Sequence, residues 1–194
     1  MQTDGRLGSD TQTVWLIDAA HTTVEFTVKN LLFFDVKGHF NNLEGNLMLD
    51  ESDICRSSVT AAIKAASIES GVMRRDAHLC SADFLEVDRY PEIRFESTRV
   101  ERGRDRDSLR VTGSLTIKDK SREVLLDVNE VDRSSSPNGE QVVYYTAQTE
   151  LDRFEFDINY GRGLIGRRLK IAISVQASRQ IKAGARSMFR GASV

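Results

Sequence analysis

The sequence is poor in the residues from which metal sites and disulfide frameworks are built. It has three histidines and two cysteines among 194 residues, and neither a His-x-x-x-His nor a Cys-x-x-Cys pair occurs. These absences argue against a zinc site and against a fold stapled by disulfides. Cys55 and Cys80 could form one bridge in an oxidising compartment, but we expect free thiols and no metal or other cofactor.

Long apolar runs and an excess of one charge are also lacking. No apolar run approaches membrane-spanning length, and residues 1–13 lack the apolar core of a secretory signal. A formal net charge of −2 and a pI near 6.0 give no general attraction to nucleic acid or to an anionic membrane. We therefore expect a cytoplasmic protein that neither spans a membrane nor binds nucleic acid.

Alternation of apolar and polar residues fills most of the chain and is typical of half-buried β-strands. Between residues 36–40 and 47–49 the alternation is broken by Asn41-Asn42, and we expect a hairpin there. Turn residues separate the other strands at short intervals. The expected strands lie at 14–17, 24–28, 36–40, 47–49, 57–67, 93–100, 109–117, 124–128, 142–151 and 169–175.

One segment departs from this pattern. Leu79, Ala82 and Phe84 are spaced for one face of a short helix, with charges between them, and Pro91 then starts a strand. We expect a helical plug near residues 72–85. It would close one end of the structure formed by the strands.

The chain has no internal repeat and no low-complexity linker, which indicates one folded domain. We expect a flexible N-terminal arm over residues 1–12, the folded domain over 13–178 and a C-terminal tail over 179–194. That tail contains Lys182, Arg186 and Arg190 without an acidic residue.

Strands joined as antiparallel neighbours allow either a sandwich with a packed interior or an up-and-down barrel. A barrel of about eight strands holds either side chains or one small ligand, depending on the bulk of its inward residues. The inward faces mix Phe26 and Phe95 with Gly38, Gly113 and Ala61. This mixture suits an apolar cavity, but packed cores contain it too.

Several short motifs occur in a fixed order. They are Trp15-x-Ile17-Asp18-x-x-His21-Thr22, Phe26-x-Val28, Gly38-x-Phe40, Gly45, Ser67-Ile68, Arg75-Asp76-x-His78-Leu79, Asp83-Phe84, Tyr90-Pro91-x-Ile93-x-Phe95-x-Ser97 and Val111-x-Gly113-x-Leu115-Thr116-Ile117. In this order they resemble the YceI-like family of polyisoprenoid-binding proteins over about residues 13–178. Two places differ from the family pattern: residues 119–122, and residues 153–157 beside the expected cavity.

The resemblance implies an all-β fold: an extended, antiparallel, lipocalin-like β-barrel of about eight strands with a long apolar pore. It also implies a protein that binds, carries or stores a long-chain isoprenoid lipid, of the polyprenyl phosphate or quinone type, and that is not an enzyme. A homodimer is plausible on the same ground. The expected wall residues are Phe26, Val28, Phe40, Ile63, Phe84, Phe95, Leu115, Ile117, Leu126, Phe154, Phe156 and Ile173.

Three polar side chains are candidates for contact with the lipid headgroup: His21, Arg75 and His78. The planar guanidinium of arginine suits a phosphate, but Asp76 and Asp83 are near enough in the sequence to pair with Arg75 instead. The two histidines could equally stabilise their own turns by hydrogen bonds.

Two other functions stay open. An enzyme acting on a lipid or quinone could use His21 or His78 as a general base. Alternatively, a lipid-free interaction module could use the helical plug and the edges of the sheet.

Overall fold

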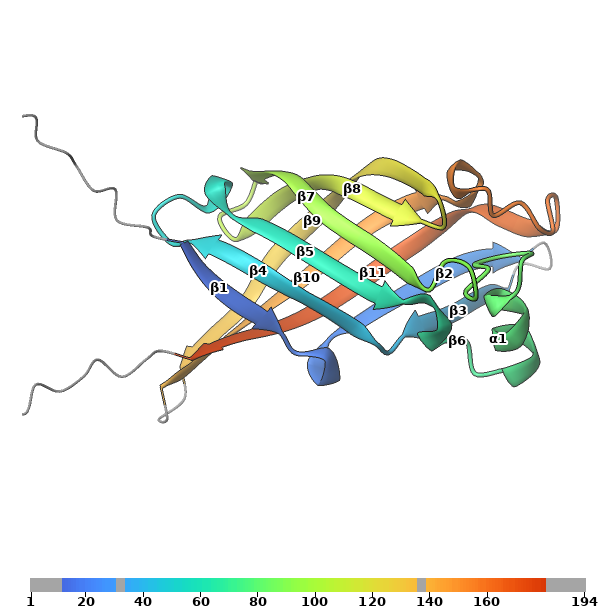
Figure 1. Cartoon of the computed structure of the whole chain (residues 1–194). Helices are drawn as coiled ribbons and strands as arrows, with labels where there is room; N and C mark the ends of the chain where they lie inside the picture. Colours follow the sequence, from blue (N-terminus) through green and yellow to red (C-terminus); the bar gives the residue numbers. More distant parts are fainter. Residues whose placement is uncertain (1–11, 31–33, 136–138, 181–194) are drawn as a thin grey trace, which may run out of the picture.

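Figure 1 shows the computed structural model of the chain, which describes residues 12–30, 34–135 and 139–180. The strands are β1 (Gln12–Ile17), β2 (Thr23–Asn30), β3 (Asp35–Phe40), β4 (Leu43–Asp50), β5 (Ser58–Lys64), β6 (Ile68–Glu69), β7 (Glu92–Arg102), β8 (Ser108–Ile117), β9 (Lys120–Ser135), β10 (Glu140–Asp152) and β11 (Ile165–Gln180). The helices are α1 (Met73–Cys80) and the 3-10 turns η1 (Ala19–His21), η2 (Ile54–Arg56), η3 (Ala65–Ser67) and η4 (Arg153–Phe156).

The strands form one antiparallel sheet that closes on itself. Neighbours pair in the order β1-β4-β5-β7-β8-β9-β10-β11, and β1 also pairs with the end of β11. The rest of β11 pairs with β2, which is followed by β3 and β6. The predicted antiparallel β-barrel is therefore confirmed, with eight strands in its closed wall.

Eleven strands fill eight positions because three long strands are interrupted. β1 and β2 both run antiparallel to β11, so they continue in one direction past η1. β4 and β3 run antiparallel to β1 and β2 and form a second interrupted strand, and β5 and β6 form a third one past η3.

The predicted hairpin at Asn41-Asn42 is therefore wrong, because the chain keeps its direction there. The break is instead fixed by the neighbouring strand. The amide of Lys64 donates to the carbonyl oxygen of Asn42 at 3.0 Å, and the amide of Asn41 donates to that of Ser67 at 3.4 Å. The breaks after β3 and after β5 thus lie side by side in the wall.

The helical plug is present in a shorter form than predicted. α1 ends at Cys80 because the amide and the hydroxyl of Ser81 both donate to the carbonyl oxygen of His78. Leu79 from the helix and Phe84 from the turn after it both face the interior of the barrel. α1 lies beside β3 and β6 at one end of the barrel (Figure 1). No helix within the described ranges is long and apolar enough to cross a membrane.

The opposite end of the barrel holds the start of β1 and the end of β11 (Figure 1). β11 continues to Gln180, so Arg179 lies in this strand and not in the predicted tail. Its side chain makes contacts described below. The remaining basic residues expected in the tail, Lys182, Arg186 and Arg190, lie outside the described residues, as do residues 1–11 of the arm expected over residues 1–12. The last residue of that arm, Gln12, instead begins β1.

Candidate functional site

The barrel encloses an apolar cavity of about 490 Å³. This volume lies within the range of small-molecule sites, roughly 300 to 1,000 Å³. On β11 the lining runs from Ile165 to Val175, and ten strand residues at ~3.3 Å each and a tilt of ~40° reach roughly 25 Å along the barrel axis. The interior is therefore a long pocket, which decides against a fully packed core.

Glycines set the positions of two aromatic rings in the wall. Gly38 lies opposite Phe26 on the neighbouring strand, and Gly113 is close to Phe95. A methyl group at either glycine would overlap the ring, so each ring lies where the glycine has no side chain. The rings cover the wall at these points and leave the lumen open.

Ten of the twelve predicted wall residues line the cavity. Several of them are only half-buried, because the cavity leaves their inward faces accessible. Their contact with a lipid stays a prediction. The ten are Phe26, Val28, Phe40, Ile63, Phe84, Phe95, Leu115, Ile117, Leu126 and Ile173.

Phe154 and Phe156 are not among the lining residues, contrary to the prediction. They belong to η4, where the chain leaves β10 and the alternation of a strand no longer applies. Phe156 is 1% exposed and packs in the core cluster. The ring centroid of Phe154 lies 4.6 Å from the guanidinium carbon of Arg162 and 5.5 Å from that of Arg167. Both aromatic rings thus stabilise the segment after β10.

Arg153 is the most deeply buried cation of the described chain and lies on the cavity wall. Its guanidinium donates to four backbone carbonyl oxygens, at distances of 2.7 to 3.0 Å. Burial lowers the pKa of Arg153, yet arginine keeps its charge in proteins. Its bonds fix the segment that crosses the barrel end near α1. The four acceptors are the carbonyl oxygens of Ile158, Tyr160, Ile165 and Gly166.

The cavity reaches the surface near α1. Tyr160 lines it and is 47% exposed, and Arg75 and His78 also line it. The ring of His78 packs edge-on against Phe84 and Tyr160, with centroids 5.0 and 4.7 Å away. We call this surface, formed by Arg75, His78, Phe84 and Tyr160, the mouth.

Two of the three predicted headgroup residues therefore lie at the mouth. Arg75 does not pair with Asp76 or Asp83: its Nε and Nη2 donate to the hydroxyl and the carbonyl oxygen of Ser70, each at 2.6 Å. Asp83 instead lies 2.8 Å from Nε2 of His78. The guanidinium of Arg75 is thus held in place by neutral oxygen atoms.

His21, the third candidate, does not line the cavity. Its Nδ1 lies 2.7 Å from Oδ2 of Asp18 in the exposed turn η1. The hydrogen bond with His21 is the main cause of the lowered pKa of Asp18. This contact fits the alternative interpretation, in which the histidine stabilises its own turn.

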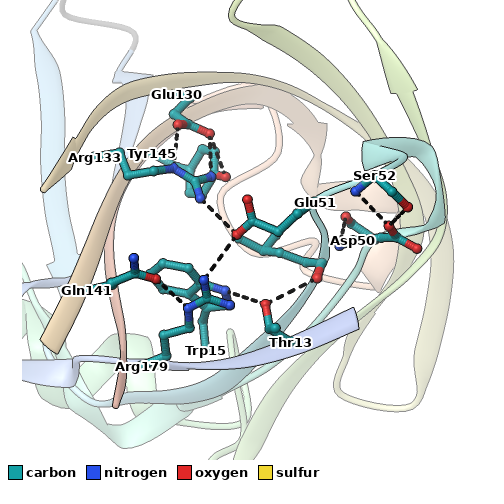
Figure 2. A network of polar contacts seen from close by, with 12 residues as sticks. Thr13, Trp15, Asp50, Glu51, Ser52, Glu130, Arg133, Gln141, Tyr145 and Arg179 are labelled. Carbon is teal, nitrogen blue, oxygen red and sulfur yellow. Dashed lines mark hydrogen bonds and ion pairs between the residues drawn. The ribbon is translucent and has the colours of Figure 1, made fainter. Parts of the chain in front are cut away.

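Inward positions become polar at the end of the barrel away from the mouth, a feature that the sequence interpretation missed. Figure 2 shows Glu51, Glu130, Arg133, Gln141 and Arg179 linked by ion pairs and hydrogen bonds around Trp15. We call these five residues the polar lid. The sequence could have indicated two of them. Glu51 follows Leu47 and Leu49 at the two-residue spacing of one strand face, and Arg179 follows Val175 and Ala177 in the same way.

Neither cysteine is part of a disulfide, as predicted. Burial raises the pKa of the Cys80 thiol, and the charges of Asp76 and Asp88 add to this effect. A higher pKa leaves less of the nucleophilic thiolate at neutral pH. Within the described ranges no group of three or more His, Cys, Asp or Glu side chains is placed to hold a metal ion.

Comparisons with known proteins agree with this geometry. The chain is 29% identical to a UPF0312 protein of Pectobacterium atrosepticum over 84% of each chain, and 28% identical to the protein YceI of Escherichia coli O157:H7 with the same coverage. The crystal structure of BcnA from Burkholderia cenocepacia superposes with a TM-score of 0.73 at 20% identity, covering 82% of this chain and 98% of BcnA.

A second solved structure is that of a polyisoprenoid binding domain from Saccharophagus degradans. It has a TM-score of 0.61 at 12% identity and covers 84% of this chain and 97% of that domain. At such identities the two solved structures show the same fold. The family model for the YceI-like domain matches residues 15–177. The chain therefore belongs to the YceI-like family.

Proposed function

We propose that this protein binds, carries or stores a long-chain isoprenoid lipid in the barrel cavity without transforming it. The observation that carries the proposal is the long apolar pocket, which opens at the mouth. Support comes from the Saccharophagus degradans structure, whose protein is described as a polyisoprenoid binding domain. The lipid is of the polyprenyl phosphate or quinone class.

Apolar burial alone is sufficient for useful affinity. Each buried CH₂ contributes about 0.8 kcal/mol, so two or three five-carbon prenyl units offer roughly 8 to 12 kcal/mol before the association entropy is subtracted. Walls of this kind distinguish one methylene by only about 1 to 3 kcal/mol. We therefore expect the wall to select for an apolar chain and not for one exact compound.

The mouth is the place for a polar headgroup in this proposal. Arg75 and His78 are the cationic or hydrogen-bonding side chains of the cavity edge there, and Tyr160 adds a phenol. Arg75 is positioned by Ser70, so its guanidinium is ordered before a ligand arrives. A phosphate or a quinone oxygen at the mouth would leave the chain among apolar side chains.

A non-catalytic role fits the bonding of the two histidines considered as general bases. Each ring forms a hydrogen bond with a carboxylate that is near in the sequence, His21 with Asp18 and His78 with Asp83. The cytoplasmic location and the homodimer stay predictions.

The proposal is tested by a charge placed on the cavity wall. Ile173 lines the cavity, whereas its neighbour Ala172 in β11 faces outward and is exposed. In Ile173→Glu a bound chain would bury an unpaired carboxylate, which costs at least about 3 kcal/mol. Affinity for a polyprenyl phosphate, measured by titration calorimetry, should fall by more than about a hundredfold.

Ala172→Glu is the matched control and should bind as the original protein does. Circular dichroism would verify that both variants keep the β-barrel. Unchanged affinity in a folded Ile173→Glu protein would show that the lipid does not enter the cavity.

A further inference from the structure

Trp15 lies where the cavity ends beside the strands β1, β10 and β11, whereas on the facing wall the lining continues to Leu49, Ile54 and Ser57. Ile17, Tyr145 and Val175 line the cavity, but the next inward residue on each of the three strands does not. Those next residues are Trp15, Val143 and Ala177, and all three are 0% exposed. They belong to one hydrophobic cluster with Leu47, Leu49 and Tyr145, which line the end of the cavity.

Two arginines hold the indole from the side away from the cavity. The guanidinium carbon of Arg179 lies 4.6 Å from the ring of Trp15, and that of Arg133 lies 5.5 Å from it. The indole Nε1 donates to the hydroxyl of Thr13 at 3.0 Å. Cation–π contacts and this hydrogen bond restrict the ring, so it cannot swing aside without breaking several contacts.

The polar lid ties the two arginines to the strands around them. Arg133 reaches Glu130 at 3.1 Å and Glu51 at 3.1 Å, and Arg179 reaches the same oxygen of Glu51 at 3.4 Å. Arg179 also donates to Gln141 at 2.6 Å. The lid thus connects β9, β10, β11 and the chain just after β4 (Figure 2).

Proton exchange does not loosen this network near neutral pH. The hydrogen bond with Glu130 raises the pKa of Arg133, and burial together with Glu130 raises the pKa of Tyr145. The phenol of Tyr145 donates to the second oxygen of Glu130 at 2.9 Å. Near neutral pH the arginine therefore stays charged and the phenol stays neutral.

We infer that Trp15, held by the polar lid, is a chain stop that sets the longest isoprenoid chain the cavity encloses. The inference rests on the proposed function. The chain enters through the mouth with its apolar end first, and its terminal methyl groups come to rest against the cluster of Trp15. Prenyl units beyond this length stay outside the mouth, in water, and add no affinity.

The chain has a single tryptophan, so its fluorescence reports on this position alone. The probes are two isomeric long-chain alkyl phosphates, one with bromine on the terminal carbon and one with bromine on the carbon next to the phosphate. Bromine quenches indole emission at close range. The terminal isomer should remove most of the emission and the other isomer little of it. Equal quenching, or stronger quenching by the second isomer, would overturn the inference while leaving lipid binding intact.

The second measurement is a series of prenyl phosphates from farnesyl to undecaprenyl. For the original protein, affinity should rise with chain length and then stay constant. Leucine is smaller than tryptophan, so Trp15→Leu enlarges this end of the cavity. The affinity should then continue to rise for at least one further prenyl unit. Phe84→Leu, at the mouth, is the control and should weaken binding without moving the chain length at which affinity levels off.

If Trp15→Leu does not fold, Glu51→Gln replaces it, because this change weakens the link between the two arginines that hold the indole, so the ring can yield to a longer chain. It should lengthen the accepted chain to a smaller extent. The inference is wrong if the affinity levels off at the same chain length in every folded lid variant. No saturable binding of any phosphate would overturn the proposed function itself and the chain stop with it.

Discussion

At the scale of single residues, Arg153 determines the stability of the segment between η4 and β11. In Arg153→Met, four carbonyl oxygens lose their donor, and a buried acceptor left unpaired costs about 1 to 3 kcal/mol. We expect the free energy of unfolding, measured in urea, to fall by about 3 kcal/mol or more.

Arg162→Met is the control in the same segment. Arg162 is exposed, donates to the side chain of Asn159 and lies 4.6 Å from the ring of Phe154, so its loss should lower the free energy of unfolding by no more than about 1 kcal/mol. Arg153→Lys should lie in between, because lysine keeps the charge but not the planar set of donors. Equal stability of Arg153→Met and the original protein would contradict the role given to these bonds.

Residue positions were predictable from the sequence wherever a strand is regular. Alternation alone places side chains such as Phe40 and Leu115 on the inward face, where the structure has them. It fails for Phe154 and Phe156, because η4 turns the chain and no sequence period shows on which side each ring lies. It also missed the polar lid, because charged residues near strand ends were interpreted as turns or tail.

At the scale of elements, the turn η4 depends on the ionised form of Asp152. One oxygen of this carboxylate accepts from the amide of Phe154, and the other accepts from Arg167 at 2.6 Å. The hydrogen bond from Arg167 is the main cause of the lowered pKa of Asp152. A carboxyl group with a lower pKa in the folded state contributes stability above its unfolded pKa, and this stability is lost as the pH falls through the folded value.

The expected result is a difference between two acid-unfolding curves. Asn at position 152 keeps the cap of η4 but has no charge to lose. Below the ordinary aspartate pKa of 3.8 the melting temperature of the original protein should therefore fall more steeply than that of Asp152→Asn. Melting curves recorded at steps from neutral to acid pH test this, and parallel curves would contradict it.

Elements were predictable to the extent that local sequence determines them. The strands and the helical plug follow from short-range periodicity and are confirmed. The direction of the chain at Asn41-Asn42 is not a local property, because it depends on backbone hydrogen bonds with Lys64 and Ser67 of the neighbouring interrupted strand. A pair of asparagines in isolation is typical of a tight turn, so the hairpin interpretation was reasonable but wrong.

At the scale of the whole molecule, the barrel has two different ends. One carries α1, the mouth and exposed Tyr160, and the other is covered by the polar lid over Trp15 (Figures 1 and 2). An apolar pocket with a polar mouth suits a ligand that has one polar end and a long apolar chain. This overall form, together with family membership, is what the proposed function rests on.

The central claim is that the cavity holds an isoprenoid lipid, and native mass spectrometry of the protein purified without detergent tests it most directly. Organic extraction and identification of the released compound follow. We expect a discrete adduct with the mass of a polyprenyl phosphate or an isoprenoid quinone. A mass equal to that of the bare chain, unchanged after incubation with polyprenyl phosphates, quinones and fatty amides, would contradict the claim.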